Sequence, residues 1–201
     1  MFVKIEYCLF FTTTNFIINQ IINQNFMNTI GNYAPDFELP GIDQKVYHLG
    51  NYLRGFEAIA VVFMSDTTEV NQYLERLKQL QTDFGGQKFT VIGIDPNYSV
   101  EPIAENIKAM QKYAQAKQLN FPYLRDSNQD VAKAFKTKVL PTVYLLDSEA
   151  VIRYQGKIDD GAESGQNHHY LRNSVVAMLA GERIERNYVE PVGRDINWRP
   201  Q

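Results

Sequence analysis

The stretch Val139-Leu140-Pro141-Thr142-Val143-Tyr144-Leu145-Leu146-Asp147 decides the fold that the sequence predicts. A proline stands directly before a run of β-branched and aromatic residues, and Asp147 then begins a turn. Because proline has no N–H to give to a strand ladder, it can open a strand but cannot lie inside a central one. A bulky residue, then Pro-Thr, then an apolar strand is typical of a cis-proline loop. A trans proline at a strand entrance is the alternative that this stretch leaves open.

A continuous apolar run at 58–64 and a second, largely apolar segment at 89–94 precede this stretch. Such runs predict strands that are buried on both faces. Between them, apolar residues at helical spacing predict one helix from Val70 to Phe84, which a glycine pair ends. The polar stretch 65–69 is predicted to cap this helix, with Asp66 and Glu69 spaced as a capping box.

Apolar periodicity and turn residues predict further helices and strands. A second helix is predicted to begin near Pro102, with its apolar face formed by Ile103, Ile107, Met110 and Ala114. A short helix after Asp126, a strand at 151–155 and a last helix at 170–180 complete the order β-α-β-α-(α)-β-β-α. Strand-helix-strand units require parallel crossovers, whereas the last two strands are close enough for a hairpin.

The composition of the chain excludes several classes of protein. The chain has 201 residues, a hydrophobic fraction of 44% and a net charge of −3, which suits one globular domain. Basic residues are scattered, so we expect no nucleic-acid partner and no membrane surface. The single cysteine, Cys8, excludes an internal disulfide and a thiolate metal cluster. Such cysteine poverty favours a cytoplasmic location.

Residues 1–26 differ in kind from the rest of the chain, because they mix Ile, Phe, Asn and Gln with almost no charge. Amides interrupt every apolar run, whereas a bilayer helix needs about 20 mostly apolar residues. No cleavage site of the signal-peptide type is present after them. We predict a low-complexity leader, either disordered or a mis-called start, with translation beginning at Met27. The domain would then span 27–181 and a polar tail 182–201, and the functional protein would contain no cysteine.

Several motifs carry a resemblance to a known family. The segment Ala34-Pro35-Asp36-Phe37-Glu38-Leu39-Pro40-Gly41, followed by a short hairpin, resembles the start of the alkyl hydroperoxide reductase and thiol-specific antioxidant branch of the thioredoxin superfamily. The stretch around Pro141 resembles the cis-proline segment of thioredoxin-like proteins. The resemblance implies a thioredoxin-like α/β fold, with a central mixed sheet, helices on both faces and an N-terminal β extension. It also implies that the proline loop lies against the redox cysteines and forms the floor of a substrate groove.

The cysteines that this family uses are missing. A thiolate in the family lies where the first buried strand meets the first long helix. The junction here reads Phe63-Met64-Ser65-Asp66-Thr67-Thr68-Glu69, with neither a C-x-x-C nor a P-x-x-x-T-x-x-C motif. The chain is similar to a small bacterial group that carries a C-x-x-C there, which puts Met64 or Ser65 at the first cysteine and Thr67 or Thr68 at the second.

The C-terminal segment repeats this pattern. Glu190-Pro191-Val192-Gly193-Arg194-Asp195-Ile196-Asn197-Trp198 resembles the P-V-G-C-x-I-x-W ending of that group, with Arg194 at the cysteine. The segments 123–126 and 156–160 are similar to its Y-L-R-D and G-x-I-D-D motifs. The scaffold motifs therefore match, whereas every thiol position departs.

We therefore expect a member of an oxidoreductase family that has lost thiol chemistry. It would keep a groove at Leu140, Pro141 and Thr142 that binds a protein or an extended peptide by strand addition. An active thiol-disulfide oxidoreductase or antioxidant peroxidase that uses another nucleophile or a thiol supplied by a partner is the alternative. A stable fold without a selected function is the third possibility. An exposed apolar patch near Met64 and Pro141 would favour the first, and a buried polar cluster with a perturbed acid the second.

Other polar residues are given structural roles. Adjacent side chains point apart, so His168 and His169 are predicted to be exposed loop histidines and not metal ligands. We expect Asp159-Asp160 to form a solvated turn or a helix cap, and Arg125-Asp126 to form a surface pair. No cofactor and no metal are expected.

Overall fold

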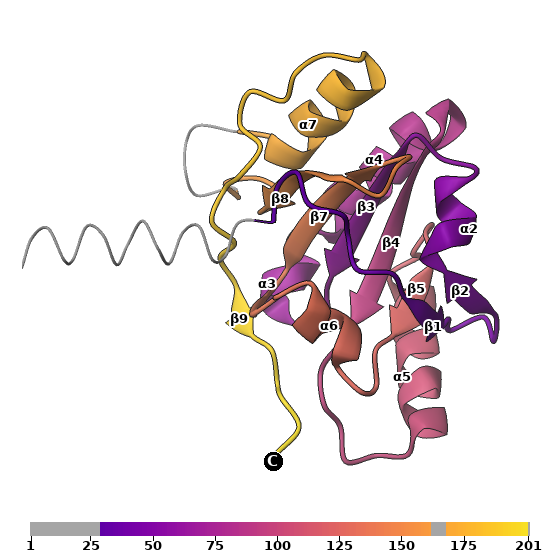
Figure 1. Ribbon diagram of the computed structural model, residues 1–201. Coiled ribbons are helices and arrows are strands. Elements are labelled where there is room, and N and C mark those ends of the chain that lie inside the picture. Colours follow the sequence, from indigo (N-terminus) through magenta and orange to yellow (C-terminus); the bar gives the residue numbers. More distant parts are fainter. Residues whose placement is uncertain (1–28, 162–167, 201) are drawn as a thin grey trace, which may run out of the picture.

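The computed structural model describes residues 29–161 and 168–200, so the predicted leader, Cys8 and the start proposed at Met27 lie outside the described residues. A five-stranded sheet in the order β5-β4-β3-β7-β8 lies at its centre (Figure 1). Its strands are β3 (Ala58–Phe63), β4 (Phe89–Asp95), β5 (Tyr123–Arg125), β7 (Thr142–Asp147) and β8 (Ile152–Gly156). β3 is parallel to β4 and β4 to β5, whereas β7 is antiparallel to both β3 and β8. The predicted central mixed sheet is therefore confirmed.

Both faces of the sheet are covered by helices. These are α2 (Leu49–Leu53), α3 (Thr68–Asn71), α4 (Leu74–Phe84), the 3-10 turn η1 (Gly85–Gln87), α5 (Ile103–Ala116), α6 (Asp130–Ala134) and α7 (Tyr170–Leu179). Figure 1 shows α6 in front of the sheet and α4 behind it. Every residue of β3 is buried, as its continuous apolar run predicts for a strand with layers on both sides.

The helix predicted from Val70 to Phe84 is broken into α3 and α4. The Tyr73 N–H donates to the Val70 carbonyl at 2.9 Å, a bond of the tighter 3-10 type. The Gln72 side chain donates to the Glu69 carbonyl at 3.1 Å, the acceptor that a continuous helix would offer to Tyr73. The apolar spacing continues across the break, which explains why periodicity alone predicts one helix.

The apolar face of α5 is also shorter than predicted. Met110 and Ala114 are buried together with Tyr113. Ile103, in contrast, is 59% exposed. Figure 1 shows the first turns of α5 extending past the end of the sheet.

Short paired segments surround the sheet. The hairpin of β1 (Glu38–Pro40) and β2 (Val46–His48) follows the A-P-D-F opening. Two short strands, β6 (Val139–Leu140) and β9 (Arg194–Asp195), pair in antiparallel register and bring the C-terminal segment against the proline stretch. Within residues 29–161 and 168–200, no helix has the length and apolar character needed to cross a bilayer.

Candidate functional site

The proline loop and the strand-helix junction lie at one edge of the sheet. Phe63, the last residue of β3, is paired with Thr142, the first residue of β7. The Leu140–Pro141 peptide bond just before it is cis. All three predicted groove residues, Leu140, Pro141 and Thr142, are buried. The fold therefore brings the predicted groove residues next to the junction 64–68.

The positions that the resemblance assigns to cysteines differ in their exposure. Met64 is fully buried and Ser65 is 3% exposed. Thr67 is half-buried, whereas Thr68 is exposed at the start of α3. No cysteine occurs among the residues that the structure describes. The junction therefore presents hydroxyl groups at the positions that the resemblance assigns to cysteines.

The predicted side-chain caps of the helix do not form. Thr67 is the N-cap residue, but its side chain accepts no hydrogen bond from α3. The Ser65 and Thr67 hydroxyl oxygens and the Glu69 Oε2 are buried and have no hydrogen-bond partner among the described residues. Asp66 accepts a hydrogen bond from the Asn71 side chain at 3.1 Å. The capping-box prediction is wrong because α3 begins one residue later, with Thr67 as the N-cap residue, and Asp66 is engaged by Asn71. Buried hydroxyls without partners are uncommon in folded proteins.

A largely buried acid, Asp95, lies at the same edge. The Met64 N–H donates to the Ile94 carbonyl at 2.8 Å, so Asp95 follows directly after that contact. Asp95 Oδ1 lies 3.4 Å from the Arg125 guanidinium and accepts the Asn97 N–H at 2.9 Å. Burial raises the pKa of Asp95 to about 6, although the positive charge of Arg125 opposes the shift.

Arg125 and Asp126 are buried, so their assignment as a surface pair is wrong. Arg125 donates to the Asn97 carbonyl at 2.5 Å and to the Asp95 carbonyl at 3.3 Å. Asp126 accepts the Ala132 N–H at 2.9 Å inside α6, and burial raises its pKa. The two side chains thus hold separate loops in place. Their polarity predicts exposure. The partners of Arg125 lie about 30 residues away in the sequence, whereas Asp126 is satisfied locally by backbone N–H groups of α6.

The C-terminal segment lies directly on the proline loop. Arg194 pairs with Leu140 and Asp195 with Val139, and the Ile196 N–H donates to the Lys138 carbonyl at 2.9 Å. Gly193 packs so closely that a Cβ there would stand 2.0 Å from the Leu140 oxygen. Arg194, the position of the third cysteine in the resemblance, therefore lies beside the cis-proline. Residues far apart in the sequence meet at this single edge.

Known proteins share the domain. The AhpC/TSA family model matches residues 30–155, more than half of the chain. The chain belongs to the AhpC/TSA family. A hypothetical protein from Sinorhizobium meliloti is similar in structure with a TM-score of 0.79 and 29% identity, over 87% of this chain and 97% of that chain. An uncharacterized conserved protein from Geobacillus kaustophilus gives a TM-score of 0.78 and 25% identity, over 86% of this chain and 93% of that chain.

The thioredoxin domain of a thiol-disulfide oxidoreductase from Bacteroides vulgatus is more distant, with a TM-score of 0.59 and 15% identity over 76% of this chain and 99% of that chain. At that identity the likeness shows the fold alone. No curated protein matches the sequence. The thioredoxin-like fold is thus confirmed, and the family is established by the AhpC/TSA match.

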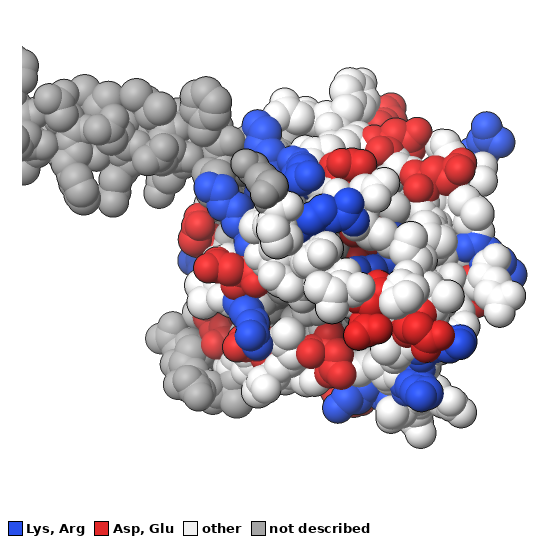
Figure 2. Space-filling view, turned by 90° about the horizontal axis from the view of Figure 1, so that it is seen from below, with Lys and Arg blue, Asp and Glu red and all other residues white. Residues whose placement is uncertain are grey.

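The edge that carries the junction and the cis-proline loop has a surface of mixed charge. Figure 2 views the molecule from below Figure 1, at the end toward which β3 and β4 run. Acidic and basic side chains alternate there, with uncharged surface between them. An extended segment at this edge would therefore meet no strong field of one sign.

Asp159 and Asp160 form no simple solvated turn. Asp159 is buried and receives two contacts from Arg76, Nε to Oδ2 at 2.9 Å and Nη1 to Oδ1 at 3.2 Å. Asp160 accepts the Tyr170 hydroxyl at 2.9 Å and lies 3.0 Å from His168 Nδ1. The solvated-turn prediction is therefore wrong for Asp159. His168 and His169 are exposed, as predicted, and the described part of the chain holds no group of three or more metal-ligating residues.

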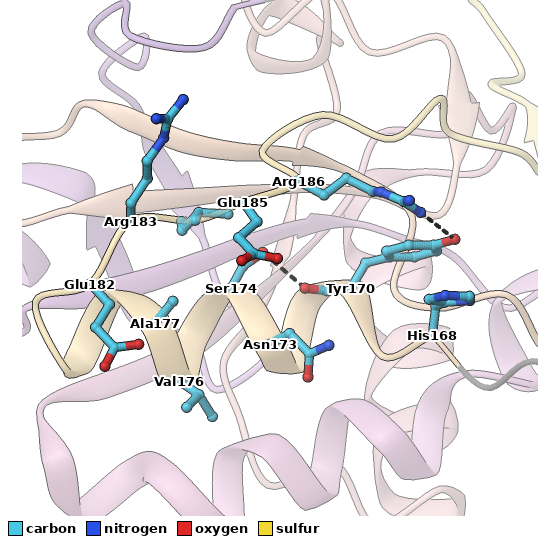
Figure 3. Close-up of a pocket in the computed structure, with 11 residues that line it drawn as sticks. His168, Tyr170, Asn173, Ser174, Val176, Ala177, Glu182, Arg183, Glu185 and Arg186 are labelled. Carbon is cyan, nitrogen blue, oxygen red and sulfur yellow. Dashed lines mark hydrogen bonds between the residues drawn. The ribbon is translucent and has the colours of Figure 1, made fainter.

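A separate pocket of about 540 Å³ lies between α7 and the segment that follows it. Figure 3 shows the His168 and Tyr170 rings side by side and Arg186 reaching the Tyr170 hydroxyl. Two arginines and two glutamates line it, at positions 182, 183, 185 and 186. The mixed charges favour neither an anion nor a cation, so this pocket supports the start of the C-terminal segment and is not the stronger site. The sequence gives no sign of it, because 182–201 has only the pattern of a polar tail.

Proposed function

We propose that this AhpC/TSA-family chain has lost thiol-disulfide exchange and acts as a binding domain for an extended peptide at the cis-proline edge. One observation carries the proposal: β9 already lies along β6 as an antiparallel strand beside Pro141. An edge that accepts one extended segment offers the backbone groups that strand addition requires. Main-chain hydrogen bonds would supply affinity, and the buried neighbours would supply specificity.

The chemistry of the junction supports the loss of exchange. Thiol-disulfide exchange requires a thiolate, which forms at accessible pH because of the low pKa of cysteine. A serine or threonine hydroxyl needs an adjacent base to act as a nucleophile. The Ser65 oxygen has no hydrogen-bond partner among the described residues, and Asp95 is engaged with Arg125 and Asn97. No nucleophile-base pair links Asp95 to Ser65 in that part of the chain.

The second candidate is an oxidoreductase that uses another nucleophile or a thiol from a partner. The buried hydroxyls near a carboxyl whose pKa is raised to about 6 favour it, because such groups occur at active sites. Met64 and Pro141 are both buried, so the described residues form no exposed apolar patch there. Binding under the first candidate would therefore depend on backbone pairing and shape.

The first experiment measures dithiol-dependent disulfide reduction and peroxide consumption by the full chain and by Cys8→Ser. We expect both to match the uncatalysed background. Ser65→Cys/Thr68→Cys should gain disulfide reduction, because Thr68 is exposed at the start of α3 and a thiolate there can attack a substrate disulfide, which the second cysteine then resolves. Met64→Cys/Thr67→Cys is the matched control and should gain far less, since Met64 is fully buried. Activity of the unmodified chain that persists in Cys8→Ser would establish the second candidate.

The binding half of the proposal is tested with a random peptide library panned against the full chain. Selected peptides should slow amide hydrogen exchange at 138–140, where the edge strand lies. Peptides that protect only another surface, such as the pocket beside α7, would contradict the assignment of the edge.

A further inference from the structure

We propose that residues 193–197 are a resident ligand of the cis-proline edge, and that an outside partner binds by displacing them. The partner is an extended segment of another protein with the same pattern, a glycine followed three residues later by an aliphatic residue and then an asparagine. This inference rests on the proposed peptide-binding function. It specifies the sequence pattern that the edge recognises and the chain segment that occupies the edge until a partner binds.

Gly193 sets the first element of the pattern. A Cβ at this position would stand 2.0 Å from the Leu140 oxygen, 2.6 Å from its carbon and 3.1 Å from the Pro141 nitrogen. All of these neighbours belong to the backbone of the loop, which cannot rotate away as a side chain can. Only glycine therefore allows an extended segment to approach the cis peptide this closely.

Ile196 sets the second element. Its side chain is 3% exposed and belongs to the hydrophobic core cluster, and its N–H donates to the Lys138 carbonyl at 2.9 Å. Arg194 and Asp195, between these anchors, are exposed. The spacing thus requires a small residue and an aliphatic residue, and it leaves the intervening positions free.

Asn197 sets the third element. Its N–H donates to Asn97 Oδ1 at 2.9 Å, and its side-chain amide donates to the Tyr98 carbonyl at 3.0 Å. Its carbonyl accepts from the Tyr98 N–H at 2.8 Å and from the buried Gln129 at 2.8 Å. An asparagine can satisfy this donor and acceptor set, whereas an aliphatic residue leaves the Tyr98 carbonyl without its side-chain donor.

The segment can leave while the chain remains tethered. Upstream, the Val189 N–H donates to the Gln155 carbonyl at 3.0 Å and the Asn187 carbonyl accepts from Gln155, which holds 187–189 on β8. Val192, between tether and anchor, is 65% exposed. A cavity of about 160 Å³ lies under this part, lined by residues of the proline loop and by Tyr188, Glu190, Pro191 and Asp195. Loose packing there separates the fixed residues 187–189 from the displaceable residues 193–197.

The test uses full-length variants and a fluorescent peptide with the sequence of residues 190–199. Gly193→Val and Ile196→Asp should each release the chain's own segment, and the peptide should then bind at least tenfold more tightly than it binds the unmodified chain. Val192→Ala changes an exposed neighbour and should bind the peptide as weakly as the unmodified chain does. A peptide that carries valine in place of the glycine should fail to bind every form. Equal binding by the unmodified chain and both release variants would overturn the displacement.

Amide hydrogen exchange provides the folding control and separates the two proposals. Protection of β3 and β4 should persist in the release variants while the Ile196 amide exchanges faster. If selected peptides protect 138–140 of the unmodified chain without exposing Ile196, the proposed function stands and the resident-ligand inference falls. If release is complete and no peptide binds, the proposed function itself fails. The unmodified chain could instead form a dimer in which residues 193–197 of one copy occupy the edge of the other. That result would show that the edge binds a second copy of this chain, and it would contradict the proposal of an outside partner.

Discussion

Single polar residues at the cis-proline edge have environments that no local pattern reveals. Asp95 ends β4 and is largely buried beside Arg125, yet burial outweighs the ion pair and raises its pKa to about 6. Because the folded state then holds the proton more tightly than the unfolded state, Asp95 stabilises the fold at low pH. That stability is present below about pH 4 and is lost as the pH rises through about 6.

We therefore predict that the free energy of unfolding of the unmodified chain falls relative to Asp95→Asn as the pH rises from 4 to 7. The shift of about two pKa units corresponds to about 3 kcal/mol. Urea titrations of both proteins across this range measure the difference. Asp95→Asn also removes a charged partner from Arg125, but the prediction concerns only how the difference changes with pH. A difference that stays constant with pH would show that Asp95 titrates normally.

At the scale of the elements, long-range polar contacts connect parts that the sequence keeps apart. The Arg76–Asp159 pair joins α4 to the segment after β8, where Asp159 also accepts the Gly161 N–H at 2.7 Å. Removing one member of a buried pair leaves the other charged group without compensation. The pair therefore contributes more than a surface ion pair does.

We expect Arg76→Ala to lower the free energy of unfolding by about 2–3 kcal/mol, less than for a fully buried pair because Arg76 keeps partial access to water. Glu57→Gln is the control, because it breaks the exposed Lys88–Glu57 pair and should change stability by less than about 0.5 kcal/mol. Chemical denaturation of both variants measures the difference. A loss for Arg76→Ala no larger than for the control would remove the structural role given to the pair.

At the scale of the whole molecule, both outer strands of the sheet are covered by segments from the ends of the described chain. Gly41 bridges to Leu124 at the β5 side, and Tyr33 bridges to Val151 beside β8. The C-terminal segment bridges Gln155 to Tyr188 before it crosses the cis-proline loop. A covered edge strand has few free backbone N–H and C=O groups, so it does not pair with strands of other chains.

Gly156 is the residue on which this cover depends most. Its φ is +153°, and a Cβ there would stand 2.2 Å from the Val189 oxygen. We predict that Gly156→Ala lowers the free energy of unfolding by at least about 2 kcal/mol, because strain and the clash add. Gly86→Ala is the control: nothing lies within 4 Å of its Cβ, so it should be neutral or slightly stabilising. Thermal unfolding of the two variants tests this, and equal melting temperatures would contradict it.

The amino-acid sequence alone is enough to predict the main helices and strands, the mixed sheet and the absence of cysteine at 64–68 and at 194, but the predicted order lacks the short strands β5 and β9. Apolar runs such as 58–63, turn residues and a missing cysteine are local facts, and local patterns determine which segments become strands. The folded arrangement was needed to show that the junction, the cis-proline loop and Gly193–Asn197 meet at one edge. It was also needed to show that Arg125 and Asp159 are buried and that the helix breaks at Tyr73. The burial of a charge, or the acceptor of a hydrogen bond, depends on partners far along the chain, and these are fixed only when the layers pack together.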